Sequence, residues 1–182
     1  FLQLDKQVLF LLPEIALTTQ LVQRLSAYFG NQIAVFHSKY NSNERVEVYN
    51  HVLQNSEKAK VVLGVRSALF LPFSNLGLIV VDEEHEATYK QQDPAPRYHA
   101  RDAAIVLAKF HNAKVLLGSA TPSLESYHNA KTNKYGLIEL FERFNNVVLP
   151  EIHLIDLKDK YFRKRMDGHF SDELLERMQE TL

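Results

Sequence analysis

Five consecutive residues that could carry out chemistry follow one short apolar run. The run is Leu-Ile-Val-Val at positions 78–81, typical of a strand buried on both faces of a parallel sheet. The residues after it are Asp82, Glu83, Glu84, His85 and Glu86. Crowding four carboxylates and an imidazole together is costly unless a cation or a reaction uses them. The cluster therefore predicts a cation-dependent site or, in the simpler interpretation, a solvated acidic turn that caps the next helix.

Phosphate chemistry is one reaction that this cluster could perform. An Asp at the end of a buried strand can hold Mg²⁺ bound to a nucleoside triphosphate, and a Glu beside it can polarise the attacking water. Asp82 and Glu83 have that arrangement. The usual phosphate-binding loop, G-x-x-x-x-G-K-[ST], is missing from the chain, because none of its six glycines is followed by a lysine.

Other catalytic centres fit the sequence poorly. His85 and Glu86 begin like the zinc motif H-E-x-x-H, but Tyr89 stands where the second histidine is needed. Ser119 lacks the G-x-S-x-G turn of a nucleophilic serine. The absence of cysteine excludes thiolate metal sites and disulfides within this chain and is typical of cytosolic proteins. An unrelated Mg²⁺-dependent hydrolase stays open as an alternative.

A parallel sheet would position the acidic cluster. The pattern predicts strands at 8–12, 33–36, 60–65, 78–81 and 114–117, and helices at about 15–29, 43–54, 101–111 and 123–131. Strands that alternate with helices predict an α/β fold, a parallel sheet with helices on both faces. Each strand ends in polar residues, namely Pro13-Glu14, His37-Ser38, Arg66-Ser67, the acidic cluster, and Ser119 with Thr121. Because such ends share one edge of the sheet, we expect them to form one site.

The last part of the chain has a different character. We expect further strands at 137–140 and 152–157, a basic run at 158–165, and a capped helix that starts at Ser171. Such a basic run is more often a solvated linker than a DNA site.

The net charge of −1 means that any nucleic-acid surface must be local. No apolar run approaches the ~20 residues that span a bilayer, so no membrane association is expected.

Several stretches together resemble the motifs of superfamily 2 helicases. Asp82-Glu-Glu-His85 is similar to motif II, and Gly118-Ser-Ala-Thr121 is similar to motif III. The stretches 12–20 and 64–73, Leu-Pro-Glu-Ile-Ala-Leu-Thr-Thr-Gln and Gly-Val-Arg-Ser-Ala-Leu-Phe-Leu-Pro-Phe, resemble motifs Ia and Ib of the PriA-type family of primosomal replication-restart helicases. Residues 89–92 and 97–102 look like that family's aromatic-rich loop. The resemblance covers about residues 8–160.

The resemblance implies a fold, an activity and partners. The fold would be a RecA-like P-loop NTPase-type sheet that lacks its first strand and Walker A loop. Residues 1–145 would be a partial first motor domain, and residues 146–182 a connector toward a second one. The full enzyme would be a bacterial, cytoplasmic, ATP-dependent 3′–5′ DNA helicase that restarts stalled forks and assembles the primosome. ATP and Mg²⁺ would be its cofactors, with zinc bound only in a region outside this chain.

The resemblance also implies roles for individual residues. Asp82 would bind Mg²⁺ through ATP, Glu83 would activate water, and His85 would relay between the nucleotide and DNA. Ser119, Ala120 and Thr121 would couple hydrolysis to strand movement. Residues expected along the DNA are Pro13, Glu14, Thr18, Arg66, Ser67, Tyr89, Lys90, Arg97, Tyr98 and Arg101. Aromatic and basic side chains suit single-stranded DNA, where stacking contributes ~1–3 kcal/mol per base.

Simpler interpretations stay open for several of these residues. Arg66 could be an ion-pair donor to the acidic cluster, and Tyr98 a half-buried anchor of its loop. Ser119 and Thr121 could cap a helix before Pro122. The chain as a whole could be a nucleic-acid-binding module on the same fold that does not use ATP.

The missing phosphate-binding loop leads to two further expectations. The chain alone should neither hydrolyse ATP nor unwind DNA. The missing strand would normally pair beside 114–117, so that strand should form an exposed sheet edge. Exposed edges invite strand pairing between molecules. We therefore expect that this piece can dimerise through that edge. The resemblance implies further partners, namely forked and single-stranded DNA, primosome proteins and single-strand-binding proteins.

Overall fold

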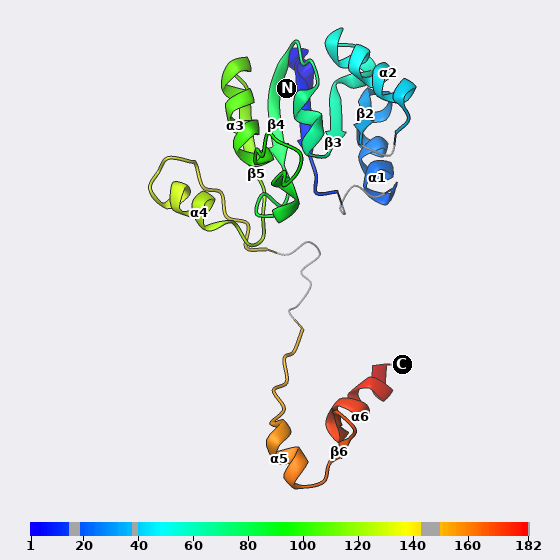
Figure 1. Ribbon diagram of the computed structural model, residues 1–182, viewed down its shortest axis with the longest axis vertical. Helices are drawn as coiled ribbons and strands as arrows, with labels where there is room; N and C mark the ends of the chain where they lie inside the picture. Colours follow the sequence, from blue (N-terminus) through cyan, green and yellow to red (C-terminus); the bar gives the residue numbers. More distant parts are fainter. Residues whose placement is uncertain (15–18, 38–39, 143–149, 182) are drawn as a thin grey trace. The chain divides into compact units, whose positions relative to one another are not determined.

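The computed structural model describes residues 1–14, 19–37, 40–142 and 150–181 (Figure 1). These residues form two compact units, Phe1–Leu137 and Ile138–Leu182. The expected domain boundary between residues 145 and 146 lies outside the described residues. None of the helices in the described part of the chain is long and apolar enough to cross a membrane.

A five-stranded sheet of order β2-β3-β1-β4-β5 is the centre of the first unit. All four strand pairings are parallel. The strands are β1 Gln7–Leu11, β2 Ile33–Phe36, β3 Val61–Gly64, β4 Leu76–Val81 and β5 Lys114–Leu117. The five predicted strands are therefore confirmed, two of them at both boundaries, and so is the parallel α/β architecture.

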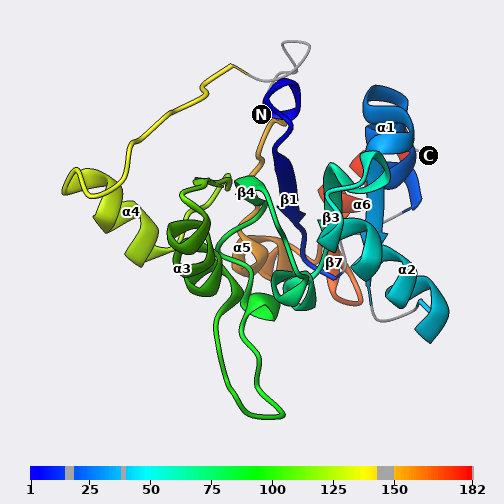
Figure 2. The same cartoon turned by 90° about the horizontal axis from the view of Figure 1, so that it is seen from above.

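Helices flank this sheet on two sides. They are α1 Thr19–Phe29, α2 Ser42–Leu53, α3 Ala100–His111 and α4 Leu124–Lys131, with short 3₁₀ turns η1 Leu2–Leu4, η2 Gly30–Gln32, η3 Glu57–Ala59, η4 Arg66–Phe70 and η5 Ala87–Tyr89. α3 packs beside β4 and β5, whereas α1 and α2 lie beside β2 (Figure 2). α2 begins within one residue of its predicted start at 43, and Asn41 caps it through a capping box with Glu44. The first residues of the predicted helix at 15–29 lie outside the described residues.

One face of the sheet carries the core. Leu9, Leu11, Ile79 and Val81 are fully buried there, in a cluster completed by Ala100, Ala104 and Ala108 of α3. Side chains alternate between faces along a strand. The alternate side chains Leu78 and Val80 of β4 are only half-buried. The prediction that 78–81 are buried on both faces of the sheet was therefore wrong. α3 and η4 pack only against the face that carries Ile79 and Val81.

Other local predictions were also wrong. Helical spacing predicts that α2 turns Val46, Tyr49, Val52 and Leu53 toward the core, but Val46, Tyr49 and Leu53 are exposed. The prediction is confirmed for Val52, which is fully buried. No strand forms at 137–140 or 152–157. A strand needs a neighbour for its backbone groups, and Leu140 and Leu154 instead remain 90% and 95% exposed.

The second unit is small. It consists of α5 Leu157–Phe162, a hairpin of β6 Met166–Asp167 with β7 Phe170–Ser171, and α6 Asp172–Thr181. The predicted cap at Ser171 is confirmed, because its Oγ accepts the backbone N–H of Leu174 at 3.2 Å. Lys160 of the basic run pairs with Asp172 at 2.8 Å and Glu173 at 3.2 Å. Part of the basic run therefore stabilises this unit.

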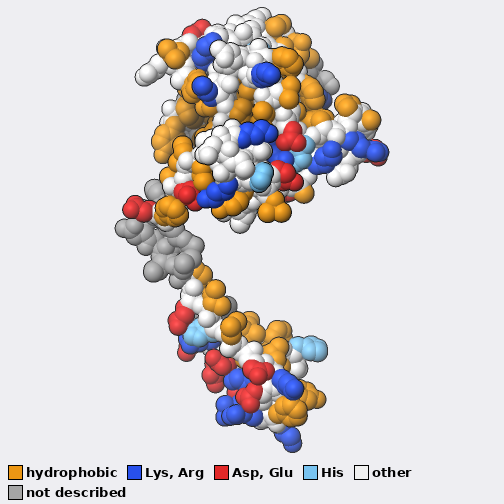
Figure 3. All heavy atoms as spheres, turned by 90° about the vertical axis from the view of Figure 1, so that its left-hand side faces the viewer, with side chains coloured by type: hydrophobic (Ala, Val, Ile, Leu, Met, Phe, Trp, Pro, Cys, Tyr) orange, Lys and Arg blue, Asp and Glu red, His pale blue; other side chains and the backbone are white. Residues whose placement is uncertain are grey.

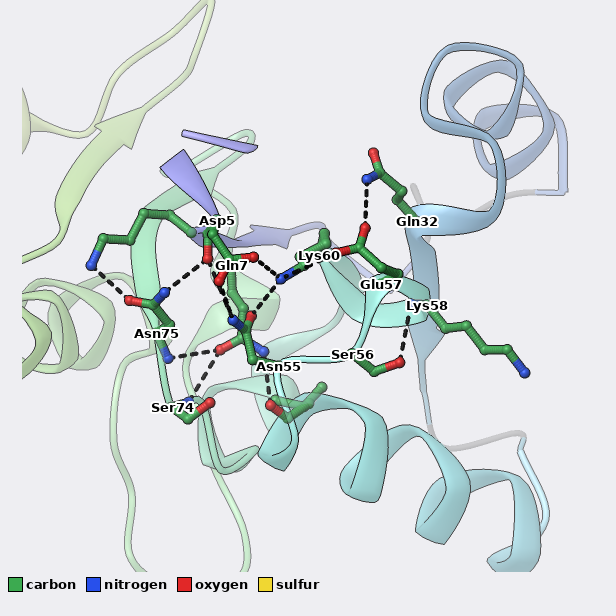
Figure 4. Close-up of polar contacts among 12 residues, drawn as sticks. Asp5, Gln7, Gln32, Asn55, Ser56, Glu57, Lys58, Lys60, Ser74 and Asn75 are labelled. Carbon is green, nitrogen blue, oxygen red and sulfur yellow. Dashed lines mark hydrogen bonds and ion pairs between the residues drawn. The ribbon is translucent and has the colours of Figure 1, made fainter. Parts of the chain in front are cut away.

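Buried polar side chains fasten the amino ends of the strands (Figure 4). Gln7, fully buried, donates to the carbonyl of Val52 at 2.8 Å and accepts the backbone N–H groups of Ser74 and Asn75 at 3.1 and 3.0 Å. Lys60 contacts Asp5 and, at 3.0 Å, Asn55. Buried polar groups are tolerated when they are paired in this way. These bonds join β1, α2 and the turn before β4, so this end of the sheet serves stability.

We expect a substitution of Gly64 to destabilise the protein. A Cβ at this position would lie 2.3 Å from the Cβ of Ala68 and 3.1 Å from the carbonyl oxygen of Phe36. Gly64→Ala should therefore lower the free energy of unfolding by about 1–3 kcal/mol, because η4 must move away from β3. Urea denaturation followed by circular dichroism measures this change. Gly136→Ala, where a Cβ meets nothing within 4 Å, is the matched control. Equal effects of both substitutions would contradict the prediction.

Candidate functional site

The acidic cluster and the Gly118–Thr121 segment lie side by side at the carboxyl ends of β4 and β5. Backbone hydrogen bonds continue past the strands: Gly118 N–H donates to Val81 at 2.9 Å, and Glu84 N–H donates to Gly118 at 3.0 Å. The N–H of Asp82 likewise donates to the carbonyl of Leu11 at 3.0 Å. The expectation that the polar strand ends come together at one edge is therefore confirmed for β4 and β5.

Asp82 and Glu83 are half-buried, so their carboxylates can be reached. Asp82 Oδ1 accepts the backbone N–H of Glu83 at 3.1 Å. Glu83 has φ of 46°, a left-handed conformation that is uncommon for residues other than glycine and clusters at functional sites. Gly118 packs against Asp82, since a Cβ there would lie 3.6 Å from Oδ1. The cluster thus presents two accessible carboxylates on a sharply turned backbone.

These residues fit magnesium held together with a nucleotide. Within the described ranges, no group of three or more His, Cys, Asp and Glu side chains could hold a metal ion. Mg²⁺ bound through substrate phosphates needs only one or two protein carboxylates. Asp82 and Glu83 supply that number, and Asp82 is the residue predicted to hold the metal.

His85 connects the acidic cluster to the neighbouring segment. Its Nδ1 lies 2.7 Å from Ser119 Oγ, and its Nε2 lies 3.4 Å from Thr121 Oγ1. The carboxylate of Glu83 lies 3.6 Å from the same Nδ1. Ala120 is exposed between the two hydroxyl residues. The structure therefore brings together predicted catalytic residues and predicted coupling residues.

A capping role for Ser119 or Thr121 was a wrong interpretation. The N-cap of α4 is Ser123, whose side chain accepts the backbone N–H of Ser126. Ser119 Oγ instead accepts the N–H of Thr121 at 3.0 Å. The two predicted coupling residues therefore lie before the helix and next to His85.

Glu84 is buried among hydrogen-bond donors, a feature that sequence reasoning missed. Its side chain is 1% exposed and accepts from Ser123 N–H (2.7 Å), Ser123 Oγ (3.1 Å), Ser126 Oγ (2.8 Å) and Arg101 Nη1 (3.0 Å). Burial is the largest influence and would raise the pKa of Glu84, but the hydrogen bonds from Ser123, Ser126 and Arg101 together lower the pKa below its ordinary value. The carboxylate is therefore charged at neutral pH.

Tyr89 and Arg101 lie inside the protein, which corrects their predicted place on the DNA. Tyr89 is 1% exposed, and its hydroxyl donates to the carbonyl oxygen of Asp82 at 2.7 Å. Burial raises the pKa of Tyr89, so the phenol stays protonated as this donor requires. Arg101 is 9% exposed and forms ion pairs with Glu84 and, at 2.9 Å, with Asp102. Their hydrogen bonds support the acidic turn, and neither side chain is free to stack on a base or pair with a phosphate.

Arg66 fastens the loop that follows the acidic cluster. Its Nη1 donates to the carbonyl oxygens of Thr88 at 3.0 Å and Lys90 at 3.3 Å. This contact replaces the ion pair with the acidic cluster that we considered from the sequence. Ser67 is half-buried in η4 beside it. Arg66 therefore joins η4 to the predicted DNA-binding loop.

The loop at residues 90–98 is held by its own side chains. Lys90 Nζ donates to the carbonyl of Arg97 at 2.6 Å, and Arg97 Nε donates to the carbonyl of Gln92 at 2.7 Å. Tyr98 is half-buried, as the interpretation as an anchor required, and its ring meets Phe70 edge-on at 5.1 Å. Phe70 is 66% exposed and was not predicted as a site residue. The signal available in the sequence was an aromatic residue in the same stretch, 64–73, as the predicted DNA-binding residues Arg66 and Ser67.

Two of the remaining predicted DNA-binding residues lie just after β1. Pro13 is buried and Glu14 is exposed. Thr18 lies outside the described residues. Figure 3 shows basic, acidic and histidine side chains mixed on one face of the first unit. On that face a nucleic acid would meet individual cations and not a broad basic surface.

Comparison with known proteins identifies the class of protein. A family model described as DEAD/DEAH box helicase matches residues 2–130. The chain therefore belongs to the DEAD/DEAH box helicase family, which agrees with its parallel sheet and with the motif positions described above. The C-terminal domain of the DEAD-box protein Dbp5 aligns with a TM-score of 0.47 at 13% identity, covering 74% of this chain and 72% of that chain.

Within the family, the chain is similar to proteins named Replication restart protein PriA. It is 44% identical to that of Bacillus subtilis over 97% of this chain and 22% of the relative. The protein of Haemophilus influenzae is 47% identical over 100% of this chain and 24% of its own length. The protein of Rickettsia felis is 43% identical over 100% and 27%. The chain thus spans about a quarter of the length of these relatives, and its resemblance to the PriA-type family is confirmed.

The buried Glu84 should make stability depend on pH. A carboxyl whose pKa is lowered by folding contributes stability that is present above its unfolded pKa and lost as pH falls through its folded pKa. We expect Glu84→Gln to be roughly 1–3 kcal/mol less stable than the wild type at pH 7. That difference should shrink as pH falls below the ordinary carboxyl range of about 4. Urea unfolding of both proteins across this pH range measures it, and a difference that stays constant with pH would contradict the prediction.

Proposed function

We propose that the chain is part of the first motor domain of an ATP-dependent 3′–5′ DNA helicase of the replication-restart type. One observation carries this proposal: His85 of the acidic cluster lies in hydrogen-bond contact with Ser119 and Thr121. The two segments are those that resemble motifs II and III. The relatives are named for replication restart, which supports a role of the whole protein in restarting replication. We extend the proposal to stalled forks and to assembly of the primosome.

The proposed chemistry follows from the positions of three side chains. The reachable carboxylate of Asp82 would hold the Mg²⁺ that accompanies ATP, and Glu83 would orient the attacking water. Bound Mg²⁺ supplies charge neutralisation for phosphoryl transfer. His85 would pass changes at this site to Ser119, Ala120 and Thr121, because it already contacts both hydroxyls.

The proposed DNA contacts come from a smaller set than the sequence suggested. Tyr89 and Arg101 are left out because their side chains are buried and paired. The set retained is Pro13, Glu14, Thr18, Arg66, Ser67, Lys90, Arg97 and Tyr98. Exposed Arg97 and the edge-on pair of Tyr98 with Phe70 support a contact with single-stranded DNA, because bases stack on aromatic rings.

The proposal also covers the ligands, partners and cellular location of the whole protein. Forked and single-stranded DNA would be its ligands, and primosome and single-strand-binding proteins its partners, in the bacterial cytoplasm. Residues 1–145 would belong to the first motor domain, and residues 146–182 would lead toward the second. Any zinc would bind in a region outside this chain. Because no glycine in this sequence precedes a lysine, this chain alone would not cradle ATP phosphates and would be inactive.

The missing phosphate loop also favours one alternative, a nucleic-acid-binding module that does not use ATP. ATP hydrolysis by the full-length protein, with and without single-stranded DNA, separates the two functions. We expect DNA to stimulate hydrolysis, this chain alone to be inactive, and Glu83→Gln to lower kcat roughly 10²-fold or more, since it removes the group that orients water. Glu125→Gln, an exposed carboxylate on α4, is the control. Binding of DNA without any ATP turnover by the wild type would establish the alternative.

The edge of the sheet supports a second expectation, namely self-association of this chain. β5 is the last strand in the sheet order, and its Leu116 side chain is 51% exposed. Unpaired backbone groups on such an edge can pair with a second copy. Light scattering over a concentration series should therefore show a dimer, and Leu116→Lys should weaken it, because a charged edge opposes pairing. Leu53→Lys, equally exposed on α2, should leave it unchanged. A monomer at every concentration would refute this expectation.

A further inference from the structure

Residue 84 binds both ends of one short segment, which we call the coupling segment, Ser119–Pro122. On one side, the backbone N–H of Glu84 donates to the carbonyl of Gly118 at 3.0 Å. On the other side, the Glu84 carboxylate accepts the backbone N–H of Ser123 at 2.7 Å. The residues immediately before and after the coupling segment are thus attached to the same residue of the acidic cluster.

The middle of the coupling segment is attached to the next residue. His85 contacts Ser119 at 2.7 Å and Thr121 at 3.4 Å. Two adjacent residues therefore hold the segment and its two flanking residues at four points, which ties its position to that of Glu84 and His85. Glu84 itself is 1% exposed, whereas Asp82 and Glu83 are half-buried, so Glu84 is not a group that a bound nucleotide would reach.

The two oxygens of the Glu84 carboxylate have different partners. Oε1 accepts the backbone N–H of Ser123, while Oε2 accepts Arg101 Nη1 and the hydroxyls of Ser123 and Ser126. A glutamine of the same shape has only one acceptor oxygen. Whichever way its amide is turned, its NH₂ group faces either the Ser123 N–H or the Arg101 guanidinium. Only the carboxylate satisfies all the donors that surround this position.

We propose that Glu84 is a positioning residue that keeps the coupling segment in register with the acidic turn, so that nucleotide and DNA sites respond to each other. This inference rests on the proposed function. Loss of the Glu84 carboxylate should leave the nucleotide carboxylates and the DNA-binding loop in place. It should loosen the connection between them. DNA stimulation of hydrolysis would then fall while both ligands still bind.

The test uses the full-length protein with Glu84→Gln. The measurements are kcat and KM for ATP, with and without a single-stranded oligodeoxythymidylate, the affinity for that oligonucleotide, and Tm. We expect the DNA-stimulated kcat to fall roughly ten- to a hundredfold, the scale of a small misplacement of reacting groups. The KM for ATP and the affinity for DNA should change little. Some loss of Tm is expected in either case; a merely structural role would lower the basal and the DNA-stimulated kcat by the same factor and would weaken the binding of ATP and DNA as well.

Two further variants sharpen the result. Ser126→Ala removes one of the donors and keeps the carboxylate, so DNA stimulation should fall by a smaller factor. Glu125→Gln changes an exposed carboxylate on the same turn of α4 and should match the wild type. If Glu84→Gln does not fold, Ser126→Ala decides: reduced stimulation at normal ligand affinity supports the inference, and full stimulation overturns it.

The outcomes separate this inference from the proposed function. If the wild type hydrolyses ATP in response to DNA and folded Glu84→Gln does so equally well, Glu84 is not a positioning residue. If the wild type itself shows no DNA-stimulated hydrolysis, the helicase proposal fails, and this inference fails with it.

Discussion

The arrangement of the sheet edge that carries the acidic cluster depends on the hydrogen bonds of the buried Glu84 carboxylate. A charge removed from water is stable only when it is fully hydrogen-bonded or paired. Here the donors come from the backbone and hydroxyl of Ser123, from Ser126 and from Arg101. Because these donors belong to the starts of α3 and α4, the single carboxylate fixes the positions of two helices relative to the end of β4.

The two ends of the sheet use polar residues in different ways. At the amino end, Gln7 and Lys60 are buried and their hydrogen bonds are closed within the protein. At the carboxyl end, Asp82, Glu83 and His85 remain accessible beside that buried Glu84. Ligands of open α/β sheets bind beyond the carboxyl ends of the strands. The accessible side chains of the acidic cluster thus lie at the carboxyl ends of the strands, and the buried polar side chains at the amino ends provide stability.

The loop after the acidic cluster is supported through backbone acceptors. The Tyr89 hydroxyl holds the carbonyl of Asp82, and Arg66 holds the carbonyls of Thr88 and Lys90. The Tyr89 side chain is enclosed by this role, whereas Arg66 stays half-buried and accessible. Arg97 and the ring of Phe70 are more exposed still and can also meet a ligand. Residue type alone could not show that Tyr89 and Arg101 are buried and paired within the protein.

The sequence by itself determined the sheet, the motifs and the meeting of two strand ends. The strands at 33–36 and 114–117 were predicted at both boundaries, because short apolar runs between turn residues leave little choice of conformation. That the acidic cluster and Ser119 lie at a common edge followed from the parallel sheet, while the individual contact of His85 with Ser119 is a finding of the structure. Apolar runs such as 137–140 misled because a strand exists only when a neighbour pairs with it.

Only the tertiary structure decided which polar residues are inside. Glu84 and Arg101 are 17 residues apart, and Glu84 and Ser126 are 42 apart. No local pattern records such a distant partner, so Glu84 looked like one more member of an acidic turn. Burial and charge state depend on partners that folding brings together, and that is why the sequence could name the acidic cluster but not the one carboxylate in it that is buried.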